Sequence, residues 1–272
     1  MLAQGLPVPR NAEAAERMSR AAREGGAVPA WIGLVGGELR VGLSEDELER
    51  FCQPAGIAKV ARRDLPVVLA RGGLGATTVS ATIFAAHAAG ITTCATGGIG
   101  GVHPGSGDVS ADLLELARTP VLLVCSGPKS IVDPVATAER LEELGVALVG
   151  YGVDRMPFFL AREAPVEVEH RVETPEEAAA IGRAQRALGV RSAVLLCNPV
   201  PVSHAMDPGE VERAVRRAEE RAAREGVRGK ALTPFLLSAL AEETAGASLE
   251  ANLALLESNA RVAAEVATAA RS

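Results

Sequence analysis

Three of the 28 basic residues in this 272-residue chain are lysines, and one of them, Lys129, stands just beyond a strand-like run. The run 120–125 is apolar, and Gly127-Pro128 marks the turn that ends it. Arginine always carries its proton, whereas a desolvated lysine can lose it and attack a carbonyl carbon. Lys129 is therefore a candidate nucleophile, although an arginine-rich chain can also keep a lysine that has no chemical role. Its position has to decide between the two interpretations.

A second group with chemical potential is the acidic stretch 107–112, "GDVSAD", in which Asp108 and Asp112 flank Ser110. If a helix begins near Ser110, Asp108 lies in the loop before it and Asp112 in its first turn. One interpretation is helix capping and a favourable dipole interaction. The other is a hard-cation site, in which one carboxylate and several waters hold Mg²⁺ or Mn²⁺ beside a phosphate. His103 could touch phosphate or metal, but a lone histidine is more often a hydrogen-bonded loop residue.

Three further stretches could bind an anion. "RGGLGATT" (71–78) leads into a helix and "GGIGG" (97–101) is a second glycine-rich loop, so each is either a phosphate loop or a flexible connector. "AKVARRDLP" (58–66) is either an anion clamp around Lys59 or a solvated basic face. None of them has a dinucleotide fingerprint, and "GPKS" is not a Walker A motif, so nucleoside triphosphates are not indicated.

Composition excludes several classes of protein. The net charge of −6 argues against a nucleic-acid or anionic-membrane partner, and 3% aromatic residues leave no platform for stacking bases. No apolar stretch approaches the roughly 18 residues that a membrane span needs, and no signal peptide opens the chain. The four cysteines show no C-x-x-C spacing, and three lie in apolar runs, which is typical of reduced thiols. We expect a cytoplasmic protein.

The elements that must position these residues alternate along the chain. Amphipathic segments predict helices at 11–24, 44–52, 77–89, 110–118, 133–144, 174–188, 207–225, 233–244 and 248–270. Apolar runs predict strands at 28–35, 38–43, 57–60, 91–96, 120–125, 146–151, 166–172 and 192–197. The first two strands form a hairpin around Gly36-Gly37. The alternation from 91 to 197 predicts an α/β fold with a mainly parallel central sheet flanked by helices. We expect one domain over 1–272, with a helical C-terminal part from about 207 to 272.

Ligands of such sheets gather at the carboxyl ends of the strands. The unusual segments "CATGGIGGVHPG", "CSGPKS", "GYGVD" and "CNPVP" each follow a predicted strand. Lys129 therefore stands where chemistry is normally done, which favours a functional role for its amine.

Several motifs occur together in one order: "GLPVPRNAEAA", "KVARRDLP", "CATGGIGGVH", "DVSADLLELA", "VCSGPKSIVD" and "SLEANLAL". With them the chain resembles the pseudouridine-5′-phosphate glycosidase family, also called indigoidine synthase A-like proteins, over essentially its whole length. The resemblance implies an α/β/α fold and reversible cleavage of the carbon–carbon glycosidic bond of pseudouridine 5′-phosphate to uracil and ribose 5-phosphate.

The resemblance also implies roles for individual residues. Lys129 is the nucleophile that attacks C1′ of the ribose and forms a Schiff base. One largely water-coordinated Mn²⁺ per subunit is held by Asp108. The implied substrate contacts are Lys59, Val79, Ser110, Ala111 and Asp112, with Thr77, Thr78, His103 and Asn252 near the phosphate. Members of the family are cytoplasmic homotrimers that act on a small molecule, so no nucleic-acid or membrane partner is expected.

The chain departs from the family pattern in two places. The family's general acid is a glutamate in a Glu-Ser-Thr segment shortly before a His-Gly-x-Pro turn. Here Gln4-Gly5-Leu6-Pro7 occupies that turn, so we expect the glutamate upstream of Met1. Without it, proton transfer would slow by roughly 10²–10⁴-fold. The loop between His103 and Asp108 is also shorter than in the family.

Two other functions stay open from the sequence. One is a catalytically impaired, phosphosugar-binding paralogue that lacks the acid. The other is a Schiff-base aldolase acting on a phosphosugar, since lysines at strand ends also serve that chemistry.

Overall fold

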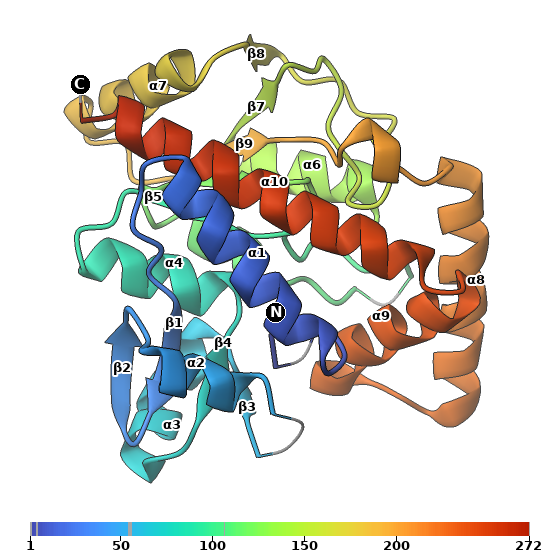
Figure 1. Cartoon of the computed structure of the whole chain (residues 1–272). Coiled ribbons are helices and arrows are strands. Elements are labelled where there is room, and N and C mark those ends of the chain that lie inside the picture. Colours follow the sequence, from blue (N-terminus) through green and yellow to red (C-terminus); the bar gives the residue numbers. More distant parts are fainter. Residues whose placement is uncertain (1, 4, 54–55, 106, 272) are drawn as a thin grey trace.

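The structure of the chain is a computed structural model that describes residues 2–3, 5–53, 56–105 and 107–271 (Figure 1). Its strands form two separate sheets, and helices surround both. The long helix α10 (Ala247–Ala269) crosses the molecule beside α1 (Arg10–Glu24).

The larger sheet has five parallel strands in the order β5-β6-β9-β7-β8. Their bounds are β5 Thr93–Ala95, β6 Leu122–Cys125, β7 Ala147–Tyr151, β8 His170–Val172 and β9 Val194–Cys197. The central pair aligns Leu122 with Val194 and Cys125 with Cys197. The predicted parallel sheet over 91–197 is confirmed, and all strand ends that carry the unusual segments meet at one edge.

Helices cover both faces of this sheet, because successive side chains of a strand point to opposite faces. Leu122, Val124 and Leu196 pack against α7 (Pro175–Ala187) and α10. Leu123, Leu195 and the two cysteines Cys125 and Cys197 pack on the other face. The helices there are α4 (Val79–Ala88), α5 (Ala111–Leu116) and α6 (Pro134–Glu143). The result is the predicted α/β/α arrangement, and burial on both faces explains why β6 and β9 are unbroken apolar runs.

The smaller sheet contains the strands that precede residue 78, in the order β2-β1-β4-β3. They are β1 (Ile32–Val35), β2 (Glu38–Val41), β3 (Ala58–Val60) and β4 (Gly75–Thr77). The predicted hairpin is confirmed: Val35 pairs with Glu38, and the turn residues Gly36 and Gly37 have φ values of 60° and 86°. Two central residues with positive φ match the twist of a two-residue hairpin.

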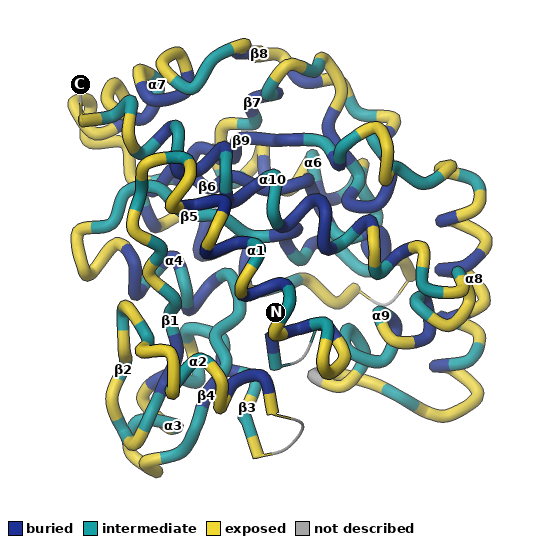
Figure 2. The backbone as a smooth tube through the Cα atoms, in the orientation of Figure 1, coloured by how far each residue is buried: buried dark blue, intermediate teal, exposed yellow. Residues whose placement is uncertain are grey.

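The remaining α-helices of the described residues are α2 (Glu45–Phe51), α3 (Leu65–Arg71), α8 (Pro208–Glu225) and α9 (Leu232–Glu243). Ser44 and Thr174 form complete capping boxes at the starts of α2 and α7. The sequence predicts neither α3 nor β4. Figure 2 shows α10 buried along most of its length, whereas α8 keeps an exposed side.

The single domain predicted for 1–272 stays a prediction, and α8 to α10 account for its helical C-terminal part. Among the described residues, no helix is long and apolar enough to cross a membrane.

Candidate active site

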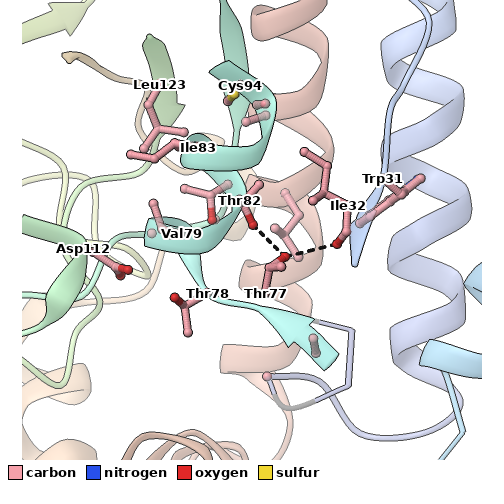
Figure 3. Close-up of a pocket in the computed structure, with 18 of the residues that line it drawn as sticks. Trp31, Ile32, Thr77, Thr78, Val79, Thr82, Ile83, Cys94, Asp112 and Leu123 are labelled. Atoms are coloured by element: carbon pink, nitrogen blue, oxygen red, sulfur yellow. Dashed lines mark hydrogen bonds between the residues drawn. The ribbon is translucent and has the colours of Figure 1, made fainter. Parts of the chain in front are cut away.

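A cavity of about 910 Å³ is lined by residues of both sheets, of α4 and of α10 (Figure 3). It contains every residue that the sequence analysis assigns to a site. These are Lys59, Thr77, Thr78, Val79, His103, Asp108, Ser110, Ala111, Asp112, Lys129 and Asn252. Residues from 59 to 252 therefore meet in one place, while their individual roles stay predictions.

Lys129 lies in the loop that follows β6, at the carboxyl edge of the parallel sheet. Its backbone N–H donates to Ile99 O at 3.0 Å, which fixes the loop against the neighbouring one. Burial lowers the pKa of the Lys129 amine from its ordinary value, while Asp112 and, less strongly, Cys125 favour the charged form. The amine therefore loses its proton more readily than a lysine in water, as a nucleophilic lysine must.

The "GGIGG" loop packs tightly against the loop of Lys129. Ile99 N–H donates to Gly127 O at 3.1 Å, and a Cβ on Gly100 would lie 2.2 Å from Ser110 Oγ. Gly127 has φ of 74°, and a Cβ there would lie 1.9 Å from Pro157 O. A side chain on Gly100 would collide with that of Ser110, and one on Gly127 with the backbone of Pro157. The hydrogen bonds of Ile99 to the loop of Lys129 show that 97–101 is not a flexible connector.

Asp112 joins α5 to the first turn of α4. Its Oδ1 accepts Ser80 N–H at 2.9 Å, its Oδ2 accepts Gly100 N–H at 3.0 Å, and the residue is 5% exposed. Amides at a helix N-terminus attract anions. At Ser80 that position is filled by the protein's own carboxylate, so the phosphate-loop interpretation of 71–78 is weakened there. This stretch spans the end of α3, all of β4 and the residues leading into α4.

The two predicted threonines use their hydroxyls within the protein. Thr77 Oγ1 donates to Ile32 O at 3.1 Å and accepts a hydrogen bond from Thr82 Oγ1 at 2.8 Å (Figure 3). Thr78 Oγ1 lies 2.9 Å from Ser80 Oγ. Thr77 therefore helps to fix α4 against β1 and β4, in addition to lining the cavity.

The basic motif 58–66 is divided between two functions. Lys59 of β3 and Arg63 line the cavity. Arg62 instead forms an ion pair with the buried Glu115 and lies 4.4 Å above the Phe84 ring. Arg62 is therefore partly exposed but has a structural partner, whereas Lys59 and Arg63 could serve an anion clamp.

His103 and Asp108 face each other across their short loop. His103 N–H donates to Asp108 O at 2.9 Å, and Val102 and Val109 form an antiparallel bridge beside them. Burial lowers the pKa of His103, opposed by the charge of Asp108 and assisted by those of Lys59 and Lys129. His103 therefore lies within electrostatic reach of Asp108, Lys59 and Lys129.

The donor set limits the kind of metal that fits. Within the described part of the chain, no cluster of three or more His, Cys, Asp or Glu side chains could hold an ion. Asp108 is exposed at the cavity. A hard cation held by one carboxylate and completed by water and substrate oxygens fits this arrangement, and a site built from three protein ligands does not.

Asn259, which no sequence motif indicates, is a fully buried residue of α10 that contacts the loops at this edge of the sheet. The stretch 253–266 also contains Glu257, Ser258, Arg261 and Glu265, so no local pattern distinguishes this asparagine. It lies seven residues after Asn252, so the two share a face of the helix.

Comparisons with known proteins agree with this geometry. The family model described as "Indigoidine synthase A like protein" matches residues 1–269. A pseudouridine-5′-phosphate glycosidase of Symbiobacterium thermophilum is 49% identical, over 99% of this chain and 90% of that protein. The protein of the same name from Thermus thermophilus is 50% identical, over 99% of this chain and 94% of its own length.

Two solved structures are similar to this chain in both fold and sequence. The crystal structure of an indigoidine synthase A-like protein from Thermotoga maritima has a TM-score of 0.92 and 41% identity. The match covers 98% of this chain and 89% of that one. The prealnumycin C-glycosynthase AlnA, in complex with ribulose 5-phosphate, has a TM-score of 0.88 and 42% identity, with coverage of 95% and 86%. With its fold, its cavity and these relatives in agreement, the chain belongs to the indigoidine synthase A-like family.

Proposed function

We propose that this chain is a pseudouridine-5′-phosphate glycosidase, which cleaves and forms the carbon–carbon bond between ribose 5-phosphate and uracil. The observation that carries the proposal is Lys129, an amine with a lowered pKa in a cavity at the carboxyl edge of the sheet. The names of the relatives from Symbiobacterium and Thermus support the substrate.

The chemistry explains why an amine is needed. An ordinary glycosidase protonates the leaving oxygen, but a carbon–carbon bond has no such oxygen. The neutral Lys129 amine attacks C1′ and the C1′–O4′ bond breaks; the nitrogen, now positively charged, gives up one proton, and O4′ takes one, so the nitrogen regains its lone pair. The nitrogen lone pair then forms a C1′=N bond while the bond from C1′ to the uracil ring breaks, and that ring carbon takes a proton. Water hydrolyses the resulting iminium to ribose 5-phosphate and restores the amine.

The other cavity residues have roles that follow from their charge. Lys59 and Arg63 are the cations that would bind the phosphate. Asp112 balances the positive charge on the nitrogen of Lys129, since it already favours the protonated amine. Asp108 would hold Mn²⁺, which when bound supplies positive charge beside the substrate phosphate.

Protons must also be delivered to O4′ and to the uracil ring. Among the described residues, the acidic side chains that line the cavity are Asp64, Asp108 and Asp112. Asp64 accepts the N–H of Ala61, and both oxygens of Asp112 accept backbone amides. The resemblance assigns this task to a glutamate in a Glu-Ser-Thr segment, so a version that carries such a segment is the comparison for the assay.

The test measures uracil release from pseudouridine 5′-phosphate with Mn²⁺, together with borohydride trapping of ribose 5-phosphate and peptide mass spectrometry. We expect the adduct on Lys129. Lys129→Arg should lose turnover by a factor on the order of 10⁶, as for removal of a covalent nucleophile. Lys59→Arg should keep the adduct. A version with a Glu-Ser-Thr segment ahead of Met1 should be faster by roughly 10²–10⁴-fold.

The products separate this function from the two alternatives. An aldolase would form the same adduct but would split the sugar and release no uracil. A paralogue that only binds phosphosugars would bind ribose 5-phosphate but would neither release uracil nor split the sugar. An adduct on Lys230, or full turnover by Lys129→Arg, would contradict the proposal.

We also propose a cytoplasmic homotrimer. Val109, Leu114 and Val135 are each 44–46% exposed, and Val109 lines the cavity, so we name them as apolar side chains that subunit contacts would cover. Light scattering on the purified chain, with Leu114→Glu as the variant expected to dissociate, tests the assembly.

A further inference from the structure

The side chain of Asn259 reaches the first residue beyond each of three adjacent strands. Its Nδ2 donates to Thr96 O, after β5, at 2.8 Å and lies 3.1 Å from Ser126 Oγ, after β6. Its Oδ1 accepts from Asn198 Nδ2, after β9, at 2.9 Å. A single amide group on α10 therefore connects the carboxyl ends of β5, β6 and β9.

This amide is isolated from water. Asn259 and Ser126 are 0% exposed and Asn198 is 6% exposed. A buried polar group is costly unless its hydrogen bonds are made, and a connected buried network fixes one arrangement of its members. Removing Asn259 would leave the carbonyl of Thr96, the hydroxyl of Ser126 and the amide of Asn198 without this partner.

The network continues directly to Lys129. Ser126 N–H donates to Gly97 O at 2.8 Å, Ile99 N–H to Gly127 O at 3.1 Å, and Lys129 N–H to Ile99 O at 3.0 Å. These bonds join 97–99 to 126–129 in parallel, with a bridge between Ile99 and Pro128. Asn259 holds the beginning of both segments through Thr96 and Ser126, and Lys129 stands at the far end.

We propose that Asn259 is a positioning residue for the reaction, which sets the place of the Lys129 amine by fixing the ends of β5, β6 and β9. The inference rests on the proposed function for its catalytic consequence, but the placement of the amine can be measured without it. The hydrogen bonds of Asn259 go to Thr96, Gly97, Ser126 and Asn198, none of which is assigned to the substrate, so Asn259 acts through Ser126 and the paired loops.

The variant Asn259→Asp keeps the shape but turns the Nδ2 donor into an acceptor that faces Thr96 O. The matched control is Asn11→Asp. Asn11 is 2% exposed, and its Nδ2 likewise donates to two backbone carbonyls, those of Leu2 at 3.1 Å and Cys52 at 3.0 Å. Both variants remove a buried amide donor, but only Asn259 is connected to the loop of Lys129.

Two readouts are compared for both variants and the unchanged chain. The first is kcat and KM for uracil release. For Asn259→Asp we expect kcat to fall by about 10²-fold, as for a misplacement near 1 Å, with KM little changed. The second is the rate of acetylation of Lys129 by acetic anhydride as a function of pH, read by peptide mass spectrometry. A loosened loop admits water, so the half-maximal pH of labelling should move up toward that of an ordinary lysine in Asn259→Asp and not in Asn11→Asp.

The two readouts separate the possible failures. If the unchanged chain releases no uracil but Asn259→Asp alone shifts the labelling curve, the proposed function fails and the positioning role stands. If uracil is released and the two variants behave alike in kcat and in labelling, Asn259 is merely structural and the inference is overturned. Should Asn259→Asp not fold, Asn198→Ala, which removes one donor to Asn259 Oδ1, should shift both readouts in the same direction by a smaller factor.

Discussion

Arg62 and Glu115 connect the two sheets through one ion pair, with Arg62 Nη1 2.7 Å from Glu115 Oε1 and 2.9 Å from Oε2. Arg62 follows β3, which carries Lys59, and Glu115 lies on α5, three residues after Asp112. The pair therefore holds the two sides of the cavity together. The side chains differ in environment: that of Glu115 is 5% exposed and that of Arg62 is 41% exposed.

This difference predicts unequal effects of removing each partner. Arg62→Leu leaves a buried carboxylate with Thr119 Oγ1, at 2.5 Å, as its remaining side-chain partner, and should cost about 3–5 kcal/mol of unfolding free energy. Glu115→Gln leaves an arginine that water can reach and should cost only about 1–2 kcal/mol. Urea unfolding of the two variants measures the difference. Equal losses would show that the burial of Glu115 does not control the energy of the pair.

The lowered pKa of Lys129 predicts that the lysine destabilises the fold at neutral pH. The unfolded chain binds this proton more tightly than the folded chain does, so the free energy of unfolding rises with pH through the window between the lowered pKa and the ordinary 10.5. Asp112 and Cys125 reduce this cost, while His103 and Lys59 are the other titratable groups nearby. Lys129→Met should therefore melt at a higher temperature than the unchanged chain at pH 7.

That gain in melting temperature should shrink as pH approaches 10.5, where both states of the unchanged chain lose the proton. Thermal unfolding followed by circular dichroism between pH 6 and pH 10.5 tests this. Arg63→Met, which removes a cavity cation that does not titrate in this range, is the control. A gain that stays constant with pH would contradict the prediction.

Asp112→Asn should destabilise the chain although the change is isosteric. The carboxylate accepts Ser80 N–H and Gly100 N–H with different oxygens, and an asparagine would turn its NH₂ group toward one of these donors. The expected loss is about 1–3 kcal/mol for the buried amide left unsatisfied.

Asp133→Asn is the matched control for Asp112→Asn. Asp133 caps α6 by accepting the N–H groups of Val135 and Ala136 with the same oxygen, Oδ1. An asparagine keeps that oxygen, so the loss should be a few tenths of a kcal/mol, in line with the similar capping strengths of the two residues. Chemical unfolding of both variants gives the comparison, and a similar loss in the two would refute the argument from separate oxygens.

Asp108→Asn should weaken Mn²⁺ binding by at least about 10–100-fold, because the one carboxylate proposed to hold the ion loses its charge. Electron paramagnetic resonance of added Mn²⁺ measures the free ion directly and does not depend on turnover. Asp154→Asn, at an exposed carboxylate that pairs with Arg171, is the control for a general change in charge. An unchanged affinity of Asp108→Asn for Mn²⁺ would contradict the proposal that Asp108 holds the ion.

The parallel sheet and most helices could be predicted because their signals are local. Strands buried on both faces read as unbroken apolar runs, and Ser44 and Thr174 satisfy amides only three residues away. Strand β4 carries no such signal. Gly75–Thr77 becomes a strand because it pairs with Ala58–Val60 and with Gly33-Leu34. Its glycine is fixed by packing, since a Cβ on Gly75 would lie 2.7 Å from Val60 Cγ2.

The motifs also predict which residues meet at the cavity. They do not predict which of two neighbouring residues lines the cavity and which forms a structural contact. Arg62 and Arg63 are adjacent and chemically identical, yet Arg62 pairs with Glu115, 53 positions away, while Arg63 lines the cavity. Asn259 shows the same limit: its partners lie 61, 133 and 163 positions away in the chain. Contacts of this kind are set by the folded arrangement and leave no trace in a local pattern.

The close contact between Gly127 and Pro157 restricts which amino acids position 127 can accept. A mutant library selected for activity should return glycine alone at codon 127, because any side chain would collide with the carbonyl oxygen of Pro157. Gly105 also has a positive φ, 64°, but has open space around it, so asparagine should survive selection there. Sequencing the surviving clones at both codons would distinguish position 127, where a side chain has no space, from position 105, where only the backbone conformation limits the residue type.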